Sequence, residues 1–390
     1  MTLFLYALLA CEPTAEKDDT AESETDTDTD TDSDTDTDTD SDTDTDTDTD
    51  TDTDTDGNTA AVVVTVDATY TVGAVNVIDA DGTTRTDLLA VGGDTVVATS
   101  PDRTWILSRG GENTVAGYVR TSFGTPSVEF STGDASNPHD VAECGGKLFV
   151  SLFGSGRLAV YDPVTGLPSG DVDLGAWGAA DPDGTIDVDD LYVSPDGRLY
   201  VTLLHLDGYE ANDPGALVRV DCSTLAAVDG WEVGPNPSMS VTGGTMYLFG
   251  GDYYNDDFSG PNLDGGLWTF DLASETLAGP LLTEEELGAN IGNVAIAPGG
   301  KGILTTDDGY TWDVWCIDLA DESVTLITQP GAFIGGASLA RDGRVWLAQR
   351  PDYLGSTDPQ TGVVVYDPAT CLVETTHRFG FDPYSMAFSE

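Results

Sequence analysis

The feature that most constrains the fold is a unit of short apolar strands that recurs along the chain from about residue 60. A clear copy is NPHDVAECGGKLFVSLFGSGRLAVYDPVTG, residues 137–166. Each copy has an alternating strand, a Pro-Asp-Gly or Gly-Gly turn, a second apolar strand, a variable loop and a third strand that usually closes on Asp, which is a repeated hairpin signal. The third strands are predicted to end near Asp79, Val119, Asp162, Asp221, Asp271, Asp318 and Asp367.

The spacing of these units predicts the architecture. Successive third strands are about 40, 43, 59, 50, 47 and 49 residues apart, and a period of this size with four short strands per unit is typical of a β-propeller. Six copies are complete. The seventh is split: PYSMAFSE at the C-terminus matches a first strand, and AAVVVTVD and GAVNVIDADG near the N-terminus match a second and a third. Because this pairing closes the ring and removes two sheet edges, we expect an all-β, seven-bladed β-propeller over residues 59–390.

Short motifs within these units resemble those of the YVTN-type (YVTN/NHL/WD40-like) β-propellers. That repeat has a Pro before the first strand, an SPDG turn and a strand ending in VID, and the chain contains NPHDVAE, VSPDG and VNVID at the matching places. The resemblance extends over most of residues 60–390. It implies the fold and leaves the function open, because such propellers include binding proteins, lactonases and cofactor-linked dehydrogenases.

The first eleven residues resemble a bacterial lipoprotein signal. An apolar run, residues 3–10, ends in Leu-Leu-Ala before Cys11, where the lipoprotein pattern places a cleaved and diacylated cysteine. The run is short, and no Lys or Arg precedes it, unlike an export signal. An ordinary signal fragment, or an apolar N-terminus with a buried cysteine, remains an alternative. If Cys11 is lipidated, Glu12 matches the pattern of lipoproteins sent to an outer membrane.

Residues 12–58 are predicted to be a disordered acidic linker. Thr and Asp alternate over residues 25–56, with two Ser substitutions, and neighbouring like charges without a hydrophobic face do not fold. Residues 1–57 carry 22 acidic residues and one lysine, a charge of −21, which leaves −35 of the total of −56 for the rest. Such a charge argues against a nucleic-acid partner. Threonine glycosylation and diffuse cation binding are open for this run.

Four further cysteines map to one face of the predicted propeller. Cys144 lies in the turn after a first strand and Cys222 just after the third strand of the next blade, and Cys316 and Cys371 repeat this relation. In an exported protein this pattern predicts the disulfides Cys144–Cys222 and Cys316–Cys371. Free buried thiols are the alternative. With no CxxC and three scattered histidines, a zinc site is not expected.

The opposite face, called the top face here, collects the loops before first strands and those between second and third strands. The segment DPDGTIDVDD offers four carboxylates that could hold Ca²⁺: Asp181, Asp183, Asp187 and Asp189. The spacing is not that of an EF-hand, and a solvated acidic turn is the alternative.

Three long loops, residues 205–215, 251–266 and 350–362, map to the same face. They carry aromatic residues beside Asp and Asn, a combination that suits sugars, cationic ligands or a partner protein: Tyr209, Tyr253, Tyr254, Phe258 and Tyr353. Packing of these rings within their own loops is the alternative.

Five polar residues are predicted to line the top mouth of the central channel: His139, Asp189, Ser238, Asn293 and Tyr384. Propeller lactonases place Glu, Asn and Asp ligands for calcium there, but no Glu occupies such a position here, and the sequence shows no acid–base pair and no nucleophile signature. Trp105, Trp346, Trp268 and Trp315 are expected to pack between blades.

Together these features predict a monomeric, exported lipoprotein of the bacterial outer membrane, anchored in the bilayer through diacylated Cys11. We expect a non-catalytic binding or scaffold module whose top face takes a protein or glycan partner through His139, Asn293, Tyr384 and the loop aromatics. The alternative is a calcium-dependent hydrolase of the propeller lactonase kind that uses the channel mouth. Apart from Ca²⁺, no cofactor is expected.

Overall fold

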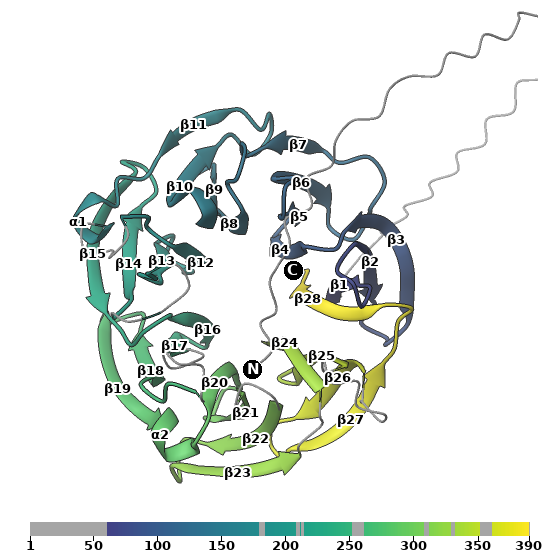
Figure 1. Cartoon of the computed structure of the whole chain (residues 1–390), viewed down its shortest axis with the longest axis vertical. Coiled ribbons are helices and arrows are strands. Elements are labelled where there is room, and N and C mark those ends of the chain that lie inside the picture. Colours follow the sequence, from purple (N-terminus) through teal and green to yellow (C-terminus); the bar gives the residue numbers. More distant parts are fainter. Residues whose placement is uncertain are drawn as a thin grey trace, which may run out of the picture. The chain divides into compact units, whose positions relative to one another are not determined.

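Seven four-stranded antiparallel sheets form a ring, which confirms the seven-bladed β-propeller (Figure 1). The computed structural model describes residues 61–178, 184–207, 211, 214–251, 261–307, 312–328, 332–351 and 361–389. Cys11, the Thr-Asp run, Asp181, Asp183 and the loop aromatics Tyr209, Tyr253, Tyr254, Phe258 and Tyr353 lie outside these residues. Among the described residues, none of the helices has the length and hydrophobicity needed to span a bilayer.

Six blades are continuous in sequence and are numbered in chain order, with the innermost strand first. Blade 1 contains β4 (Thr95–Ser100), β5 (Arg103–Ser108), β6 (Thr114–Val119) and β7 (Val128–Ser131). Blade 2 contains β8 (Pro138–Cys144), β9 (Lys147–Leu152), β10 (Arg157–Tyr161) and β11 (Pro168–Asp171). Blade 3 contains β12 (Val188–Val193), β13 (Leu199–Leu203), β14 (Ala216–Asp221) and β15 (Ala226–Glu232).

The next three blades repeat this order. Blade 4 contains β16 (Ser238–Thr242), β17 (Thr245–Gly250), β18 (Gly266–Asp271) and β19 (Thr276–Thr283). Blade 5 contains β20 (Asn290–Ile296), β21 (Lys301–Asp307), β22 (Trp312–Asp318) and β23 (Ser323–Thr328). Blade 6 contains β24 (Ala332–Leu339), β25 (Val345–Pro351), β26 (Gly362–Asp367) and β27 (Leu372–His377). In the described parts of the connections lie three short helices: η1 (Phe153–Ser155), α1 (Gly175–Gly178) and α2 (Glu284–Leu287).

Blade 7 joins the two ends of the folded domain, as the split repeat predicted. The C-terminal strand β28 (Asp382–Phe388) is innermost, followed by β1 (Ala61–Val66), β2 (Val72–Ile78) and β3 (Thr84–Gly92). Strand β1 pairs with β28 on one side, with Val62 opposite Ala387, and with β2 on the other. The first and last strands are therefore hydrogen-bonded neighbours, and the ring has no open blade.

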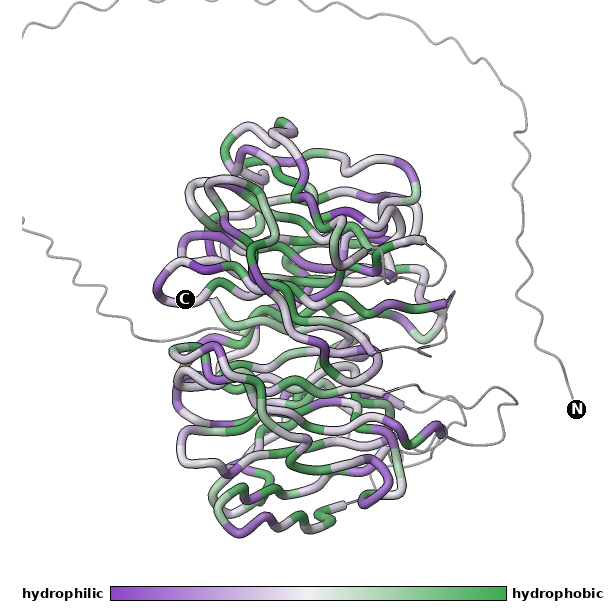
Figure 2. Tube along the Cα trace, turned by 90° about the vertical axis from the view of Figure 1, so that its left-hand side faces the viewer, coloured by the Kyte–Doolittle hydropathy of each residue, from purple (hydrophilic) through white to green (hydrophobic). Residues whose placement is uncertain are grey.

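Burial follows the position of a strand within its blade. Second strands such as β9 and β13 are buried almost throughout, whereas the outer strands β11 and β27 are mostly exposed. A second strand packs against a neighbouring blade on each face, which explains why it reads as a continuous apolar run. Figure 2 shows such hydrophobic stretches running through the strands, with hydrophilic residues gathered at many turns.

The tryptophans, Cys144, Cys222 and Cys371 lie near the places that the repeat predicted, whereas Cys316, expected in the turn after a first strand, lies within β22, the third strand of blade 5. Trp105 and Trp346 lie on second strands and are buried. Cys144 lies beside Cys222 across blades 2 and 3, and Cys316 beside Cys371 across blades 5 and 6, with Cα atoms 5.9 and 5.8 Å apart. Both separations suit disulfide bonds, and the structure joins both pairs. Their formation in the protein stays a prediction, which is tested below.

Candidate functional site

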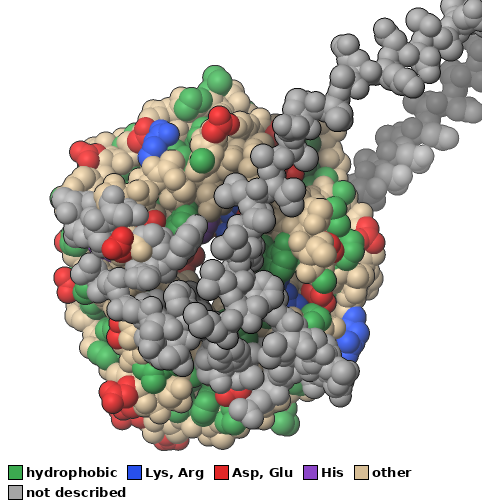
Figure 3. All heavy atoms as spheres, viewed as in Figure 1, with side chains coloured by type: hydrophobic (Ala, Val, Ile, Leu, Met, Phe, Trp, Pro, Cys, Tyr) green, Lys and Arg blue, Asp and Glu red, His purple; other side chains and the backbone are tan. Residues whose placement is uncertain are grey.

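The five residues predicted to line the channel mouth all lie on innermost strands. His139, Asp189, Ser238, Asn293 and Tyr384 belong to β8, β12, β16, β20 and β28. Each lies within the first four residues of its strand, toward the top face. Innermost strands border the central channel (Figure 1). In the space-filling view, basic and histidine side chains are visible at the wall of the central opening (Figure 3).

A hydrogen bond joins His139 and Asp189 between blades 2 and 3. The Nδ1 atom of His139 lies 2.7 Å from Oδ1 of Asp189, and its Nε2 lies 3.2 Å from Nδ2 of Asn137. The ring of Phe153 stacks on the imidazole, with centroids 4.5 Å apart. With Nδ1–H donating to the carboxylate and Nε2 accepting from the amide, both imidazole nitrogens have partners. The structure thus contains an acid–base pair where the sequence showed none.

Two further aspartates, which the sequence analysis missed, tie neighbouring innermost strands together. Asp140 on β8 accepts hydrogen bonds from the backbone N–H of Leu191 on β12, at 2.9 Å, and of Val141, at 2.8 Å. Asp190 on β12 accepts from the hydroxyl of Ser238, at 2.6 Å, and the backbone N–H of Met239 on β16, at 2.9 Å. In both cases, an aspartate on one innermost strand accepts a hydrogen bond from the backbone of the next innermost strand. Together with Asp189, these two aspartates place three carboxylates on the adjacent strands β8 and β12.

The crowding of these carboxylates changes their acidity. Burial, together with repulsion from Asp189, raises the pKa of Asp190 to about 7. Burial and repulsion from Asp190 raise the pKa of Asp140 well above its ordinary value. The electrostatic interaction with His139 acts in the opposite direction and lowers the pKa of Asp190. Asp140, Asp189 and Asp190, with His139, are called the acidic wall below. The signal in the sequence was the position of Asp140 and Asp190, each directly after a predicted mouth residue.

The opposite part of the mouth, on blades 1, 6 and 7, is basic and aromatic. The guanidinium of Arg350 lies 4.2 Å from the ring centroid of Phe333, 4.6 Å from that of Tyr70 and 5.2 Å from that of Tyr384. Arg109 pairs with Asp94 at 2.6 Å and donates to the hydroxyl of Tyr384 at 2.5 Å. Burial raises the pKa of Tyr384, so its hydroxyl stays protonated.

This arginine–aromatic wall was predicted only through Tyr384. Arg350 is 5% exposed, and its cation–π contacts help offset the loss of hydration. The residues involved are far apart in the sequence and share no motif. They meet because blade 7 joins the two ends of the propeller and so brings Tyr70 next to residues near the C-terminus.

Asn293 is engaged in holding the blades together. Its Nδ2 lies 3.3 Å from Oγ1 of Thr305 and 3.5 Å from the carbonyl oxygen of Ile334 on the innermost strand of blade 6. A side-chain amide with these contacts positions β20 against β24.

The predicted calcium loop is described only in part. The carboxylate of Asp187 is buried, and its Oδ2 accepts from the backbone N–H of Leu206 at 2.8 Å. Asp189 pairs with His139. Within the described ranges, no group of three or more His, Cys, Asp or Glu side chains is arranged to hold a metal ion. The calcium site stays a prediction, since Asp181 and Asp183 lie outside those ranges.

Solved structures share the fold of this chain. A protein from Lactobacillus plantarum matches with a TM-score of 0.54 at 14% identity, over 85% of this chain and 100% of its own. A virginiamycin B lyase from Staphylococcus aureus matches with a TM-score of 0.50 at 9% identity, over 76% of this chain and 90% of its own. BamB from Moraxella catarrhalis shows a weaker likeness, with a TM-score of 0.41 at 13% identity over 73% of this chain and 82% of its own.

At these identities the likeness shows a shared propeller fold. No family model matches the chain, and no curated protein matches it. A shared propeller fold does not by itself decide between catalysis and binding.

Proposed function

We propose that the chain is a non-catalytic binding module whose top face takes a cationic group of its partner at the acidic wall. The observation that carries this proposal is the juxtaposition of Asp140, Asp189 and Asp190 on neighbouring innermost strands. Burial and repulsion from neighbouring carboxylates make the ionised forms of Asp140 and Asp190 costly, and a cation bound beside them would lower that cost. The net charge of −56 adds a long-range attraction for such partners.

A test compares the melting temperature of the full chain with and without spermidine, a small organic cation. We expect spermidine to raise the melting temperature of the wild type, because it binds the folded state, and to raise it much less in Asp189→Asn. Asp102→Asn is the matched control: it removes one exposed carboxylate from the hairpin turn between β4 and β5. The Thr-Asp run is identical in all three proteins, so its binding of spermidine cancels. Equal shifts in the wild type and Asp189→Asn would contradict the proposal.

The second candidate function is hydrolysis at the channel mouth, and the His139–Asp189 pair is the observation in its favour. A carboxylate that orients an imidazole is a recurring arrangement for a general base. Against it, Nε2 of His139 already contacts Asn137, so the base would need to break this bond to take a proton. Calcium-dependent turnover of a lactone by the wild type, abolished by EDTA and by His139→Gln, would establish this function in place of the first.

For location, we propose an envelope protein anchored in the outer membrane through a diacylated Cys11. The adjacent cysteine pairs support this, because disulfides persist in oxidising compartments. The acidic linker would then hold the propeller away from the anionic bilayer. Mass spectrometry of the membrane fraction should find an N-terminal peptide with diacylglycerol on Cys11, and an unmodified Cys11 would refute the anchor.

A further inference from the structure

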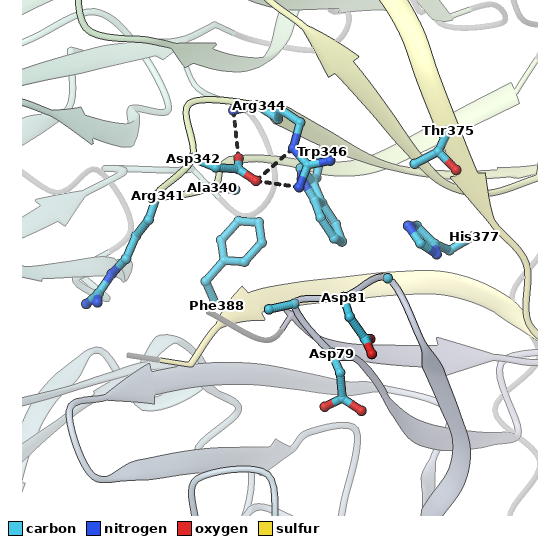
Figure 4. A pocket seen from close by; sticks show the side chains of 12 residues that line it. Asp79, Asp81, Ala340, Arg341, Asp342, Arg344, Trp346, Thr375, His377 and Phe388 are labelled. Carbon is cyan, nitrogen blue, oxygen red and sulfur yellow. Dashed lines mark hydrogen bonds and ion pairs between the residues drawn. The ribbon is translucent and has the colours of Figure 1, made fainter. Parts of the chain in front are cut away.

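A pocket of about 390 Å³ lies between blades 6 and 7, away from the channel mouth (Figure 4). It is bordered by the β2–β3 turn, by the β24–β25 hairpin turn, by the outer strand β27 and by the end of β28. This volume lies within the range of small-molecule sites. We call it the blade 6–7 pocket, and the side chains that matter here are Asp79, Asp81, Arg344, Trp346, His377 and Phe388.

Three rings form the apolar part of the pocket. His377 stacks on Trp346, with centroids 5.6 Å apart and planes 14° from parallel, and Phe388 meets Trp346 edge-on at 5.4 Å. Trp346 is 7% exposed, and its indole Nε1 is buried without a hydrogen-bond acceptor. A buried donor without an acceptor is costly, and a ligand that turns the ring enough to expose Nε1 would supply the missing partner with an oxygen atom.

Two of the charged side chains of the pocket, Arg344 and Asp79, are neutralised by contacts within the protein. Arg344 pairs with Asp342 and lies 3.6 Å from Glu374, and its guanidinium sits 5.9 Å from the Trp346 ring centroid. Asp79 accepts two hydrogen bonds from Arg85, at 2.8 and 2.9 Å. Neither side chain therefore presents a full uncompensated charge to a ligand.

The remaining groups offer hydrogen bonds of both kinds. The pKa of Asp81 is lowered by hydrogen bonds from Thr83, so this carboxylate is ionised and accepts only. Burial and the nearby Arg344 lower the pKa of His377, so its imidazole is neutral at pH 7 and offers a donor and an acceptor. Figure 4 shows Asp79 and Asp81 across the pocket from Trp346.

We infer that the blade 6–7 pocket binds a neutral, polyhydroxylated ligand, a carbohydrate of one or two sugar units. Hydroxyl groups can donate to Asp81 and accept from indole and guanidinium N–H groups, while C–H faces of a sugar pack against aromatic rings. The internal compensation of Arg344 and Asp79 disfavours a strongly charged ligand. This site is independent of the acidic wall, so it adds a second binding surface to the proposed function.

The test is ligand-observed saturation-transfer NMR on the full chain with maltose, cellobiose, lactose and N,N′-diacetylchitobiose. We expect saturation transfer from the wild type to at least one of them. Trp346→Phe keeps an aromatic ring but removes the indole N–H, and should weaken that binding by about tenfold. Trp231→Phe, a half-buried tryptophan of blade 3, is the matched control and should bind as the wild type does.

Asp81→Asn is a second variant, chosen because an exposed turn residue should leave the fold intact. It should also weaken binding, since an amide replaces an acceptor-only carboxylate. The inference is overturned if none of the four sugars receives saturation from the wild type, or if both pocket variants bind as tightly as the Trp231→Phe control.

Discussion

At the scale of single residues, several tryptophans of the propeller rest directly on glycine backbones. An added Cβ at Gly117 would lie 2.7 Å from the ring of Trp105, and Gly230, Gly234 and Gly292 stand in the same relation to Trp177, Trp268 and Trp312. Glycine by itself weakens a strand. At these positions it is favourable because the missing side chain leaves room for an indole ring.

Gly117→Ala should therefore destabilise the protein. Trp105 is fully buried and cannot move aside, so we expect a loss of about 1–3 kcal/mol in the free energy of unfolding. Chemical denaturation measures this loss. Gly124→Ala is the control, because nothing lies within 4 Å of its added Cβ. Equal changes in the free energy of unfolding for the two substitutions would show that the contact between residue 117 and Trp105 is not the cause of the loss.

Asp190 gives a pH-dependent prediction at the same scale. Its pKa is about 7 in the folded protein against an ordinary value of 3.8, so between these values the folded state holds a proton that the unfolded chain has lost. The contribution of this group to stability is thus fully present below about pH 4 and is lost as the pH rises toward 7.

Asp190→Asn should remove this dependence. The amide oxygen can still accept from Ser238 or Met239, and no charge is buried at high pH. We expect stability similar to the wild type at pH 4, and greater by about 1–3 kcal/mol at pH 8. Urea denaturation across this range is the measurement, and an unchanged slope between pH 4 and 7 would exclude Asp190 as its source.

At the scale of elements, the aspartates that close the third strands have a definite local role. Oδ1 of Asp221 accepts from the backbone N–H groups of Ser223 and Thr224, at 2.8 and 2.9 Å, and Asp162 makes the equivalent bonds to Val164 and Thr165. Such bonds fold the chain into the turn toward the outer strand. This is the physical reason for the recurring Asp that marked the repeat.

Asp221→Ala should loosen the turn between β14 and β15 and lower the melting temperature. Asp221→Asn should lower the melting temperature much less, because the amide oxygen can still accept the hydrogen bonds of the turn. Hydrogen bonds lower the pKa of Asp221 to about 2 from 3.8, so its stabilisation is present above about pH 4 and is lost as the pH falls toward 2. The difference between wild type and Asp221→Ala should therefore shrink at pH 2. A difference that persists unchanged there would speak against the turn bonds.

At the scale of the whole molecule, the ring is closed by β28 and by contacts between blades. The backbone N–H of Val97 on β4 donates to Oγ of Ser385 on β28, at 3.1 Å, as Leu191 and Met239 donate to Asp140 and Asp190. Side chains on one innermost strand thus hold the next strand at these three places, and Asn293 links β20 to β24 at a fourth. The two cysteine pairs add links between blades 2 and 3 and between blades 5 and 6.

Reduction of these disulfides should destabilise the native ring. The paired cysteines are 78 and 55 positions apart in the sequence. A disulfide that closes a loop of this length stabilises the folded protein by about 2–5 kcal/mol. The melting temperature should fall in dithiothreitol. Peptide mapping without reduction should recover Cys144 linked to Cys222 and Cys316 linked to Cys371, and four free thiols in the oxidised protein would contradict the prediction.

The sequence by itself determined the strands, their grouping into seven blades and the blade shared by both chain ends. These depend on hydrophobic alternation and turn residues over spans of ten or so residues, which are visible in one chain. It also placed five polar residues on innermost strands, because each lies near the start of the first strand of its repeat: His139, Asp189, Ser238, Asn293 and Tyr384.

Only the tertiary structure decided which side chains meet. The pairing of His139 with Asp189, the contacts of Arg350 with Tyr70 and Tyr384, and the pocket between Asp81 and Trp346 all cross from one blade to another. Such contacts depend on the twist of each sheet and on the closure of the ring, which bring together residues dozens to hundreds of positions apart. The acidity of Asp140 and Asp190 follows from that closeness and from burial, so no local pattern in the sequence could show it.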